Sequence, residues 1–343
     1  MIRPWIFEFF PELGDQAHEP DPQHVGRYFG RYLDLWTQAE ERGFEGIFFS
    51  EHHFGGSFSA SPNLLIAALA PRTHSLRLGV MGVVLPYYHP SRVIEEIGLL
   101  DHLTGGRLEI GTAVGVPQEL ARLNLSMAEA RERNDEIIEI IDAASRASVV
   151  SYRGKHFTLS DLRLLPRPLQ KPWPPIWVTV ISAESARKAA RRGAKICTGF
   201  NATSEIRMLF DAYRDEAQSV DAPAGPDHLA LRRRVAVAAT ESDARRQAEA
   251  VSARLKRYVS QDPRVTPHVP DAPLKAGGFS VSDDEFITGT PPQVAEQIIE
   301  QCRAIGAGHF LAVLHWGASI DEVADAHHIF AREVIPRLRA ASI

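Results

Sequence analysis

The sequence lacks several features that mark particular classes of protein. It has only two cysteines, Cys197 and Cys302, which are too few for a disulfide framework and form no C-x-x-C pair. Its 38 Lys and Arg residues are outnumbered by 43 Asp and Glu residues, whereas a nucleic-acid-binding protein usually carries a basic excess. No apolar run approaches the roughly 20 residues that cross a bilayer, and the short apolar start has no signal-peptide cleavage site. We therefore expect a cytoplasmic protein that binds neither nucleic acid nor membranes.

One alternation repeats along the chain: short apolar runs are followed by longer amphipathic segments such as Tyr28–Arg42, Ser91–Leu103 and Ala128–Ala147. A strand that alternates with a helix predicts a parallel sheet, and eight strands close such a sheet into a (β/α)8 TIM barrel. The runs predicted as strands are eight in number: Trp5–Phe10, Phe44–Ser50, Leu76–Leu85, Arg107–Ala113, Ile176–Val180, Ala194–Gly199, Arg233–Ala239 and His309–His315.

The alternative fold is a doubly wound open sheet, but its Gly-x-Gly-x-x-Gly motif is missing after Phe10. Two segments interrupt the alternation. Residues 148–175 are rich in Pro, Arg and Lys and predict a small excursion. Residues 260–289 hold several Pro and Gly with little periodicity, and predict either a lid or a surface loop. Since no repeat indicates a second unit, we expect a single barrel domain over residues 1–343.

Polar side chains at the carboxyl ends of barrel strands are the candidates for a site. Ser-Glu-His-His-Phe at residues 50–54 follows the second strand and leads into two glycines. His52 and His53 could exchange protons there near neutral pH, or the loop could be purely structural. Metal binding is disfavoured, because neighbouring residues of an extended chain point to opposite sides.

Other strand ends are small or apolar. Residues 79–86 could form one wall of a flat apolar pocket or belong to the barrel core, and Gly111–Gly115 would let a planar ligand approach the backbone. The run Ser182-Ala183-Glu184-Ser185 opens a helix, where hydroxyl and N–H groups could bind an anion or a serine could simply cap the helix. Cys197 is expected to be a buried core thiol, and His89 a hydrogen-bonded loop residue.

Taken together, these segments resemble the bacterial luciferase-like flavin monooxygenase family. The likeness covers most of the chain in the expected order. It is carried by Ser50–Phe54, Leu78–Pro86 with His89-Pro90, Leu99–Gly111, Glu132-Arg133, Tyr152–Phe157 and Pro166–Trp177. The resemblance implies reduced FMN at the carboxyl ends of the barrel strands, stacked on a third-strand bulge with a non-prolyl cis peptide, here Met81–Gly82.

The resemblance also implies roles for single residues. His52 matches the family's acid/base position, and His53 matches its partner. The flavin phosphate would lie on Ser182, Ala183, Glu184 and Ser185, with Arg133 or the neighbouring Arg131 from the long helix. Three positions depart from luciferase itself and put light emission in doubt: Ala113 in place of a cysteine, Val114 in place of an arginine and Lys188 in place of a phosphate-binding threonine.

The implied activity is that of a two-component monooxygenase. A separate NAD(P)H-dependent flavin reductase would supply reduced FMN, and dioxygen would oxygenate a small organic substrate through a flavin hydroperoxide. Two alternatives are a deazaflavin-dependent enzyme that transfers hydride, and a non-catalytic flavin-binding protein. The apolar stripes of residues 62–71 and 91–103 indicate a homodimer or simply cover the sheet. The substrate pocket is expected to involve Phe7, Phe9, Phe54, Phe58 and Trp177.

Overall fold

The protein is described from a computed structural model that places residues 1–11, 21–54, 57–260, 275–276, 279–280, 282–314 and 319–343. Within these residues, eight parallel strands form a closed barrel, as the alternation predicts. In order around the barrel they are β1 (Arg3–Glu8), β2 (Gly46–Phe49), β3 (Arg77–Val84), β4 (Leu108–Ala113), β7 (Ile176–Thr179), β8 (Lys195–Thr198), β9 (Leu229–Val237) and β13 (His309–Val313). The doubly wound alternative is therefore wrong.

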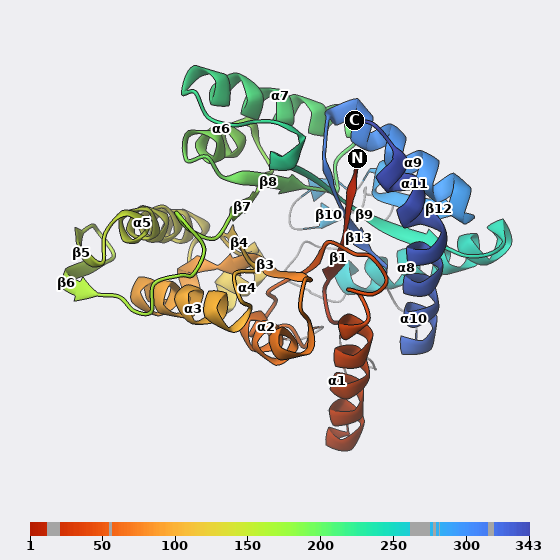
Figure 1. The fold of residues 1–343 in the computed structure, drawn as a ribbon, viewed down its shortest axis with the longest axis horizontal. Coiled ribbons are helices and arrows are strands. Elements are labelled where there is room, and N and C mark those ends of the chain that lie inside the picture. Colours follow the sequence, from red (N-terminus) through yellow and green to blue (C-terminus); the bar gives the residue numbers. More distant parts are fainter. Residues whose placement is uncertain (12–20, 55–56, 261–274, 277–278, 281, 315–318) are drawn as a thin grey trace.

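Helices surround the barrel and cover its outer face (Figure 1). Five of the described α-helices have proline as their first residue, where the missing N–H group costs nothing. The α-helices are α1 (Pro22–Thr37), α2 (Pro62–Leu69), α3 (Pro90–Leu103), α4 (Pro117–Arg122), α5 (Met127–Arg146), α6 (Ala183–Arg191), α7 (Thr203–Ser219), α8 (Glu241–Ser260), α9 (Pro291–Ile305), α10 (Ile320–Ile329) and α11 (Ile335–Ala340).

The two interrupting segments contain short sheets. Residues 148–175 form an antiparallel hairpin, β5 (Val149–Arg153) and β6 (Thr158–Arg163), which projects from one end of the molecule in Figure 1. Of residues 260–289, the stretches 261–274, 277–278 and 281 lie outside the described residues, and the predicted lid falls largely there. The described part contains the pair β10 (Lys275–Ala276) and β11 (Phe279–Ser280). It also contains β12 (Phe286–Gly289), a strand that the sequence pattern missed.

The barrel strands are buried on both faces, and their side chains divide between two cores. Alternate residues point outward and pack against the helices, while the others fill the barrel with Trp5, Phe7, Phe48, Met81 and other residues. The strand β9 begins at Leu229, four residues before the predicted start at Arg233. The apolar pattern misses this start because its buried residues include three arginines, and charged residues are rarely buried without partners.

The floor of the barrel, at the amino ends of the strands, contains a closed set of polar contacts. Trp5 donates its indole N–H to His309 Nδ1 at 2.9 Å, and Trp177 donates to Glu109 Oε2 at 2.6 Å. Arg77 pairs with the other oxygen of Glu109. Burial lowers the pKa of His309 to about 3, so its ring is neutral and can accept the Trp5 hydrogen bond.

The two ends of the chain meet at this side of the molecule, where both termini lie together in Figure 1. The backbone N–H of Ile2 donates to the carbonyl of Leu338 at 3.1 Å. Among the described residues, no helix is long and apolar enough to cross a membrane.

Candidate active site

His52 and Glu119 form a hydrogen-bonded pair at the carboxyl end of the barrel. The Nδ1 of His52 lies 3.0 Å from Glu119 Oε1, and Glu119 is buried at the start of α4. The imidazole stacks on Phe9, with ring centroids 5.8 Å apart, and about a quarter of the His52 side chain stays exposed. A carboxylate that accepts the Nδ1 hydrogen fixes the tautomer and leaves Nε2 to exchange a proton with a ligand.

His53 lies in a different network, centred on the buried carboxylate of Glu51. His53 Nε2 and the Tyr88 hydroxyl both donate to Glu51 Oε1, at 2.9 and 2.8 Å, and the backbone N–H of Val84 donates to Oε2 at 3.2 Å. The hydrogen bond to Glu51 raises the pKa of His53 despite its partial burial. Glu51 therefore ties the loop after β2 to the end of β3, and His53 serves to position that loop.

Several buried polar atoms near this pair have no hydrogen-bond partner among the described residues. They are Ser50 Oγ at the end of β2, the hydroxyl of Tyr87 and Oε2 of Glu119. Burial, aided by the charges of Glu119 and Glu51, raises the pKa of Tyr87, so its hydroxyl keeps its proton. Buried polar groups are usually completed by protein, water or ligand, so these atoms could contact a water or a polar ligand at the mouth.

The end of β3 has the bulge that the resemblance implies. The register with β4 shifts between Val80 and Val83, and the Met81–Gly82 peptide bond is cis. A Cβ atom on Gly82 would lie 2.5 Å from the backbone of Thr112, so glycine is needed for contact between β3 and β4. Gly82 therefore has a structural role in strand packing, besides any space that it leaves for a ligand. Ala113 ends β4 beside this bulge, opposite Val84.

The start of α6 is a capping box. Ser182 Oγ accepts the backbone N–H of Ser185 at 3.2 Å, and Ser185 Oγ accepts the N–H of Ser182 at 3.1 Å. The serines therefore cap the helix, as one interpretation predicts. Anion binding, the other interpretation, stays compatible with the structure, because the cap leaves the backbone groups of Ala183 and Glu184 at the helix start.

Two of the basic residues considered for the phosphate, Arg133 and Lys188, are engaged in ion pairs. Arg133 binds Glu129 on its own helix through Nε at 3.0 Å and Nη2 at 2.8 Å. Lys188 of α6 pairs with Asp135 of α5 at 3.2 Å, which places the two helices side by side. Arg133 would have to leave Glu129 in order to bind a phosphate.

The predicted aromatic pocket is only partly brought together. Phe7 and Phe9 are in contact, with centroids 4.9 Å apart, inside the barrel below His52. Phe58 packs instead against Phe10 and α1 outside the barrel, and Trp177 fills the barrel floor, so these two predictions are wrong. Trp177 points into the barrel but lies at its floor, and Phe58 lies in a loop that packs on the outer core, so residue type alone does not place either side chain.

Two other predictions on single residues, those for Cys197 and His89, are confirmed. Cys197 is a buried thiol inside the barrel, and burial raises its pKa to about 12. His89 caps α3 and contacts Ser91. Among the residues that the structure places, no group of three or more His, Cys, Asp and Glu could hold a metal ion. Glu119 and Tyr88 were not predicted from the sequence. For Glu119 a signal was present, because it is an acidic residue in the loop and helix that follow the end of the fourth barrel strand.

The fold is a (β/α)8 barrel with a hydrogen-bonded His–Glu pair at the carboxyl ends of its strands. The chain belongs to the luciferase-like monooxygenase family, which matches residues 12–309. The resemblance seen in the sequence is thereby confirmed.

Three relatives show the range of the family. The chain is 33% identical over 308 residues to the uncharacterized protein y4wF of Sinorhizobium fredii, covering 87% of this chain and 88% of the relative. It is 27% identical over 318 residues to limonene 1,2-monooxygenase of Rhodococcus erythropolis, covering 89% and 80%. It is 29% identical over 234 residues to the oxygenase component of the flavin-dependent trigonelline monooxygenase of Acinetobacter baylyi, covering 65% and 63%.

Solved structures share the fold. Monooxygenase RslO1 of Streptomyces bottropensis has a TM-score of 0.84 at 25% identity, covering 98% of this chain and 99% of that one. The oxygenating constituent of 3,6-diketocamphane monooxygenase of Pseudomonas putida, in complex with FMN, has a TM-score of 0.80 at 20% identity, covering 98% of each chain. The coenzyme F420-dependent tetrahydromethanopterin reductase of Methanopyrus kandleri has a TM-score of 0.72 at 16% identity, covering 98% and 99%. The last two likenesses concern the fold alone.

Proposed function

We propose that this flavin-dependent enzyme is the oxygenating component of a two-component monooxygenase that uses FMN. The observation that carries the proposal is the His52–Glu119 pair, held over Phe9 at the mouth of the barrel. Support for a separate NAD(P)H-dependent flavin reductase comes from the trigonelline relative, whose name describes it as an oxygenase component.

The residues at the mouth fit a flavin. Ser50, Tyr87 and Glu119 offer buried donor and acceptor atoms without partners among the described residues, and a flavin ring carries N–H and C=O groups along one edge. Met81, Gly82 and Ala113 would lie against the ring, and the α6 start at Ser182–Ser185, with Arg133, would hold the phosphate. Bound reduced FMN would supply the activation of dioxygen for transfer of one oxygen atom to a small organic substrate.

The chain's own residues would exclude water and manage protons. Phe7 and Phe9 form an apolar surface beneath His52, which keeps water from the reacting atoms. Glu119 holds the His52 ring by Nδ1, so that Nε2 can donate a proton to the substrate or accept one from it. His53, held by Glu51, would fix the loop that carries His52.

The test compares His52→Ala with His89→Ala, a matched histidine loss at a helix cap. We expect His52→Ala to bind FMN within about twofold of the wild type but to lose about 10²-fold or more in coupled oxygenation, measured with reduced FMN and oxygen uptake. His89→Ala should behave as the wild type. If His52→Ala keeps full coupled turnover, His52 is not the acid/base residue.

A deazaflavin-dependent hydride transfer is the second candidate function. The observation that favours keeping it is the shared fold with an F420-dependent reductase. The two candidates differ in their use of oxygen, so the purified protein is mixed with each reduced cofactor in an oxygen electrode. Oxygen uptake coupled to product with reduced FMN supports the monooxygenase. Anaerobic oxidation of reduced F420 by an organic acceptor would support the alternative.

We also infer that the chain is one domain and that two copies pair through α2 and α3. Leu64 of α2 and Leu99 and Leu103 of α3 are all more than half exposed, on two helices that lie against each other. A second copy would cover this apolar surface. Leu99→Glu should convert a dimer to a monomer in analytical ultracentrifugation, and a monomeric wild type would contradict the inference.

A further inference from the structure

Three consecutive arginines of β9 are buried near the mouth of the barrel. Alternate residues of a strand point to opposite faces, and Ala230 belongs to the inner core while Leu231 belongs to the outer one. Arg232 and Arg234 therefore point into the barrel, and Arg233 points toward the helices, where its Nε donates to Gln301 at 2.8 Å. Two guanidinium groups thus line the inner wall.

The loop after β8 is shaped around the guanidinium of Arg232. The centroid of the Phe200 ring lies 4.2 Å from the Arg232 Cζ. The centroid of the Phe7 ring, on β1, lies 5.7 Å from the same atom. A Cβ atom on Gly199 would come within 2.5 Å of Arg232 Nη2, and Phe200 adopts a φ of 70°, which is rare for a residue other than glycine. The aromatic contacts therefore fix the orientation of the Arg232 side chain in the folded protein.

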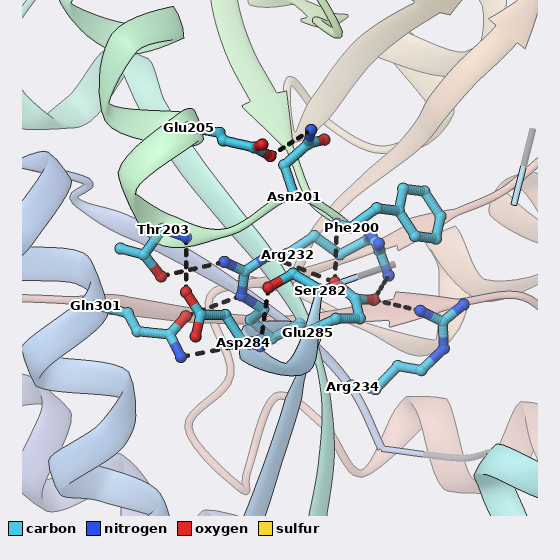
Figure 2. A network of polar contacts seen from close by, with 11 residues as sticks. Phe200, Asn201, Thr203, Glu205, Arg232, Arg234, Ser282, Asp284, Glu285 and Gln301 are labelled. Carbon is cyan, nitrogen blue, oxygen red and sulfur yellow. Dashed lines mark hydrogen bonds and ion pairs between the residues drawn. The ribbon is translucent and has the colours of Figure 1, made fainter. Parts of the chain in front are cut away.

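The buried carboxylate of Glu285 contacts all three arginines, of which Figure 2 labels Arg232 and Arg234. Arg232 and Arg234 both pair with Oε1 of Glu285, and Arg233 lies 3.5 Å from Oε2. Burial alone would raise the pKa of Glu285, but the three guanidinium groups and the N–H of Phe200 hold it below its usual value. Glu285 is therefore ionised and saturated with cations.

Within the described part of the chain, two acidic residues, Asp284 and Glu285, lie in the arginine cluster. Asp284 lies on the Arg233 side, where it accepts the backbone N–H of Thr203 at 2.7 Å. Among the residues that the structure places, all three guanidinium groups share the single carboxylate of Glu285. Arg232 is 5% exposed, and its Nη2 has no hydrogen-bond partner among the described residues. A buried guanidinium nitrogen without a hydrogen-bond partner is costly, and the oxygen of an anion would supply that partner for Arg232.

We propose that Arg232 and Arg234 bind a carboxylate or sulfonate group of the substrate, so that the enzyme selects small organic anions. The position fits this role, which rests on the proposed function. In the order around the barrel, β9 is directly opposite β3, whose Met81–Gly82 segment is assigned to the flavin. A substrate between the two walls would have its anionic end on β9 and its remainder toward the flavin.

The same position places the anion site within reach of His52. Arg232 contacts Phe7, Phe7 contacts Phe9 and Phe9 stacks on His52, with separations of 5.7, 4.9 and 5.8 Å. The two aromatic rings thus lie between the cationic end and the acid/base end. This arrangement suits an organic anion with an apolar body and its reacting carbon near His52.

The experiment measures binding of matched probes by calorimetry, to the full-length protein with and without FMN. The pairs are benzoate against benzamide and acetate against acetamide, which differ in charge at nearly constant shape. We expect the wild type to bind at least one anion tenfold or more tightly than its amide. Arg232→Gln and Arg234→Gln should lose that preference, whereas Arg234→Lys should keep part of it. Wild-type protein that shows no preference in either pair would overturn the proposal.

Two controls separate the explanations. Arg3→Gln removes the same charge at the barrel floor, where Arg3 pairs with Asp227, and should leave anion binding unchanged. FMN affinity is measured for every variant, because a loss of FMN binding equal to the loss of benzoate binding would assign the arginines to the flavin and contradict the proposal. Arg234→Gln provides a test if Arg232→Gln does not fold. An intact anion preference alongside full turnover by His52→Ala would refute the proposed His52 role alone.

Discussion

The floor and the mouth of the barrel treat their buried polar groups differently. On the floor, Glu109 is paired with Arg77 and Trp177, and His309 accepts from Trp5. At the mouth, atoms of Ser50, Tyr87, Glu119 and Arg232 have no hydrogen-bond partner among the described residues. Both ends bury polar side chains, and the floor satisfies the Glu109 and His309 set within the protein, although Nδ1 of His228, just before β9, has no partner among the described residues either.

The difference indicates that the polar groups of the floor contribute to folding, whereas those of the mouth are available to bind a ligand. A saturated polar set contributes to folding, whereas an unsatisfied set costs folding free energy and is completed by a ligand. Parallel barrels follow the same division, with stability at the amino ends of the strands and chemistry at the carboxyl ends. The comparison can be tested by variants that should affect one property and spare the other.

The largest effect is expected for Glu285→Gln, because it leaves three buried guanidinium groups without their shared carboxylate. Loss of one partner from a buried ion pair costs about 3–5 kcal/mol, so the free energy of unfolding in urea should fall by this order. Asp135→Asn, which breaks the exposed pair with Lys188, is the control and should change it little. An unchanged urea midpoint for Glu285→Gln would mean that the cluster contributes nothing to folding.

The second effect concerns the floor. Glu109→Gln removes the charge that pairs with Arg77 but keeps an oxygen for the Trp177 N–H, and we expect a loss of about 1–3 kcal/mol in unfolding free energy. FMN affinity, measured by fluorescence quenching on folded protein, should stay within about twofold of the wild type. A twofold change in affinity corresponds to about 0.4 kcal/mol of binding free energy. A parallel fall in FMN affinity would remove the distinction between floor and mouth.

The third effect depends on pH. The pKa of His53 is raised in the folded protein by its hydrogen bond to Glu51, so the protonated form is stabilised by folding. The stability difference between the wild type and His53→Gln should be fully present below the unfolded pKa of about 6.5 and disappear as the pH rises through the folded pKa. Urea unfolding from pH 5.5 to 8.5 measures it, and a difference that grows with pH would contradict the Glu51 contact.

The smallest effect is expected for Lys188→Met. Lys188 is nearly half exposed and pairs with Asp135, and such surface pairs contribute about 0–1 kcal/mol. The sequence left open whether this lysine binds the flavin phosphate. Because it is already engaged with α5, we expect FMN affinity to change less than twofold or so. A tenfold loss of FMN affinity would instead assign Lys188 to the phosphate site.

The sequence predicts most of the fold because the barrel strands and helices have clear periodicities. All eight barrel strands lie where apolar runs predict them, within a few residues at their ends. The strand β12 is not predicted, because a four-residue strand has little periodicity. The early start of β9 is not predicted either, because its buried arginines have the sequence character of an exposed loop. For the site, His52 could be selected as the residue after a strand end, but its partner Glu119 is 67 residues away.

The barrel, the family and the strand-end motif around His52 can be predicted from the sequence alone. These follow from local patterns that repeat along the chain, and a hydrophobic period is visible without any partner. Only the tertiary structure decided which carboxylate holds which histidine, that Trp177 faces the floor, and that Arg232 and Arg234 share Glu285. The physical reason is that such contacts depend on strand parity and barrel closure, which bring residues together regardless of their separation in the chain.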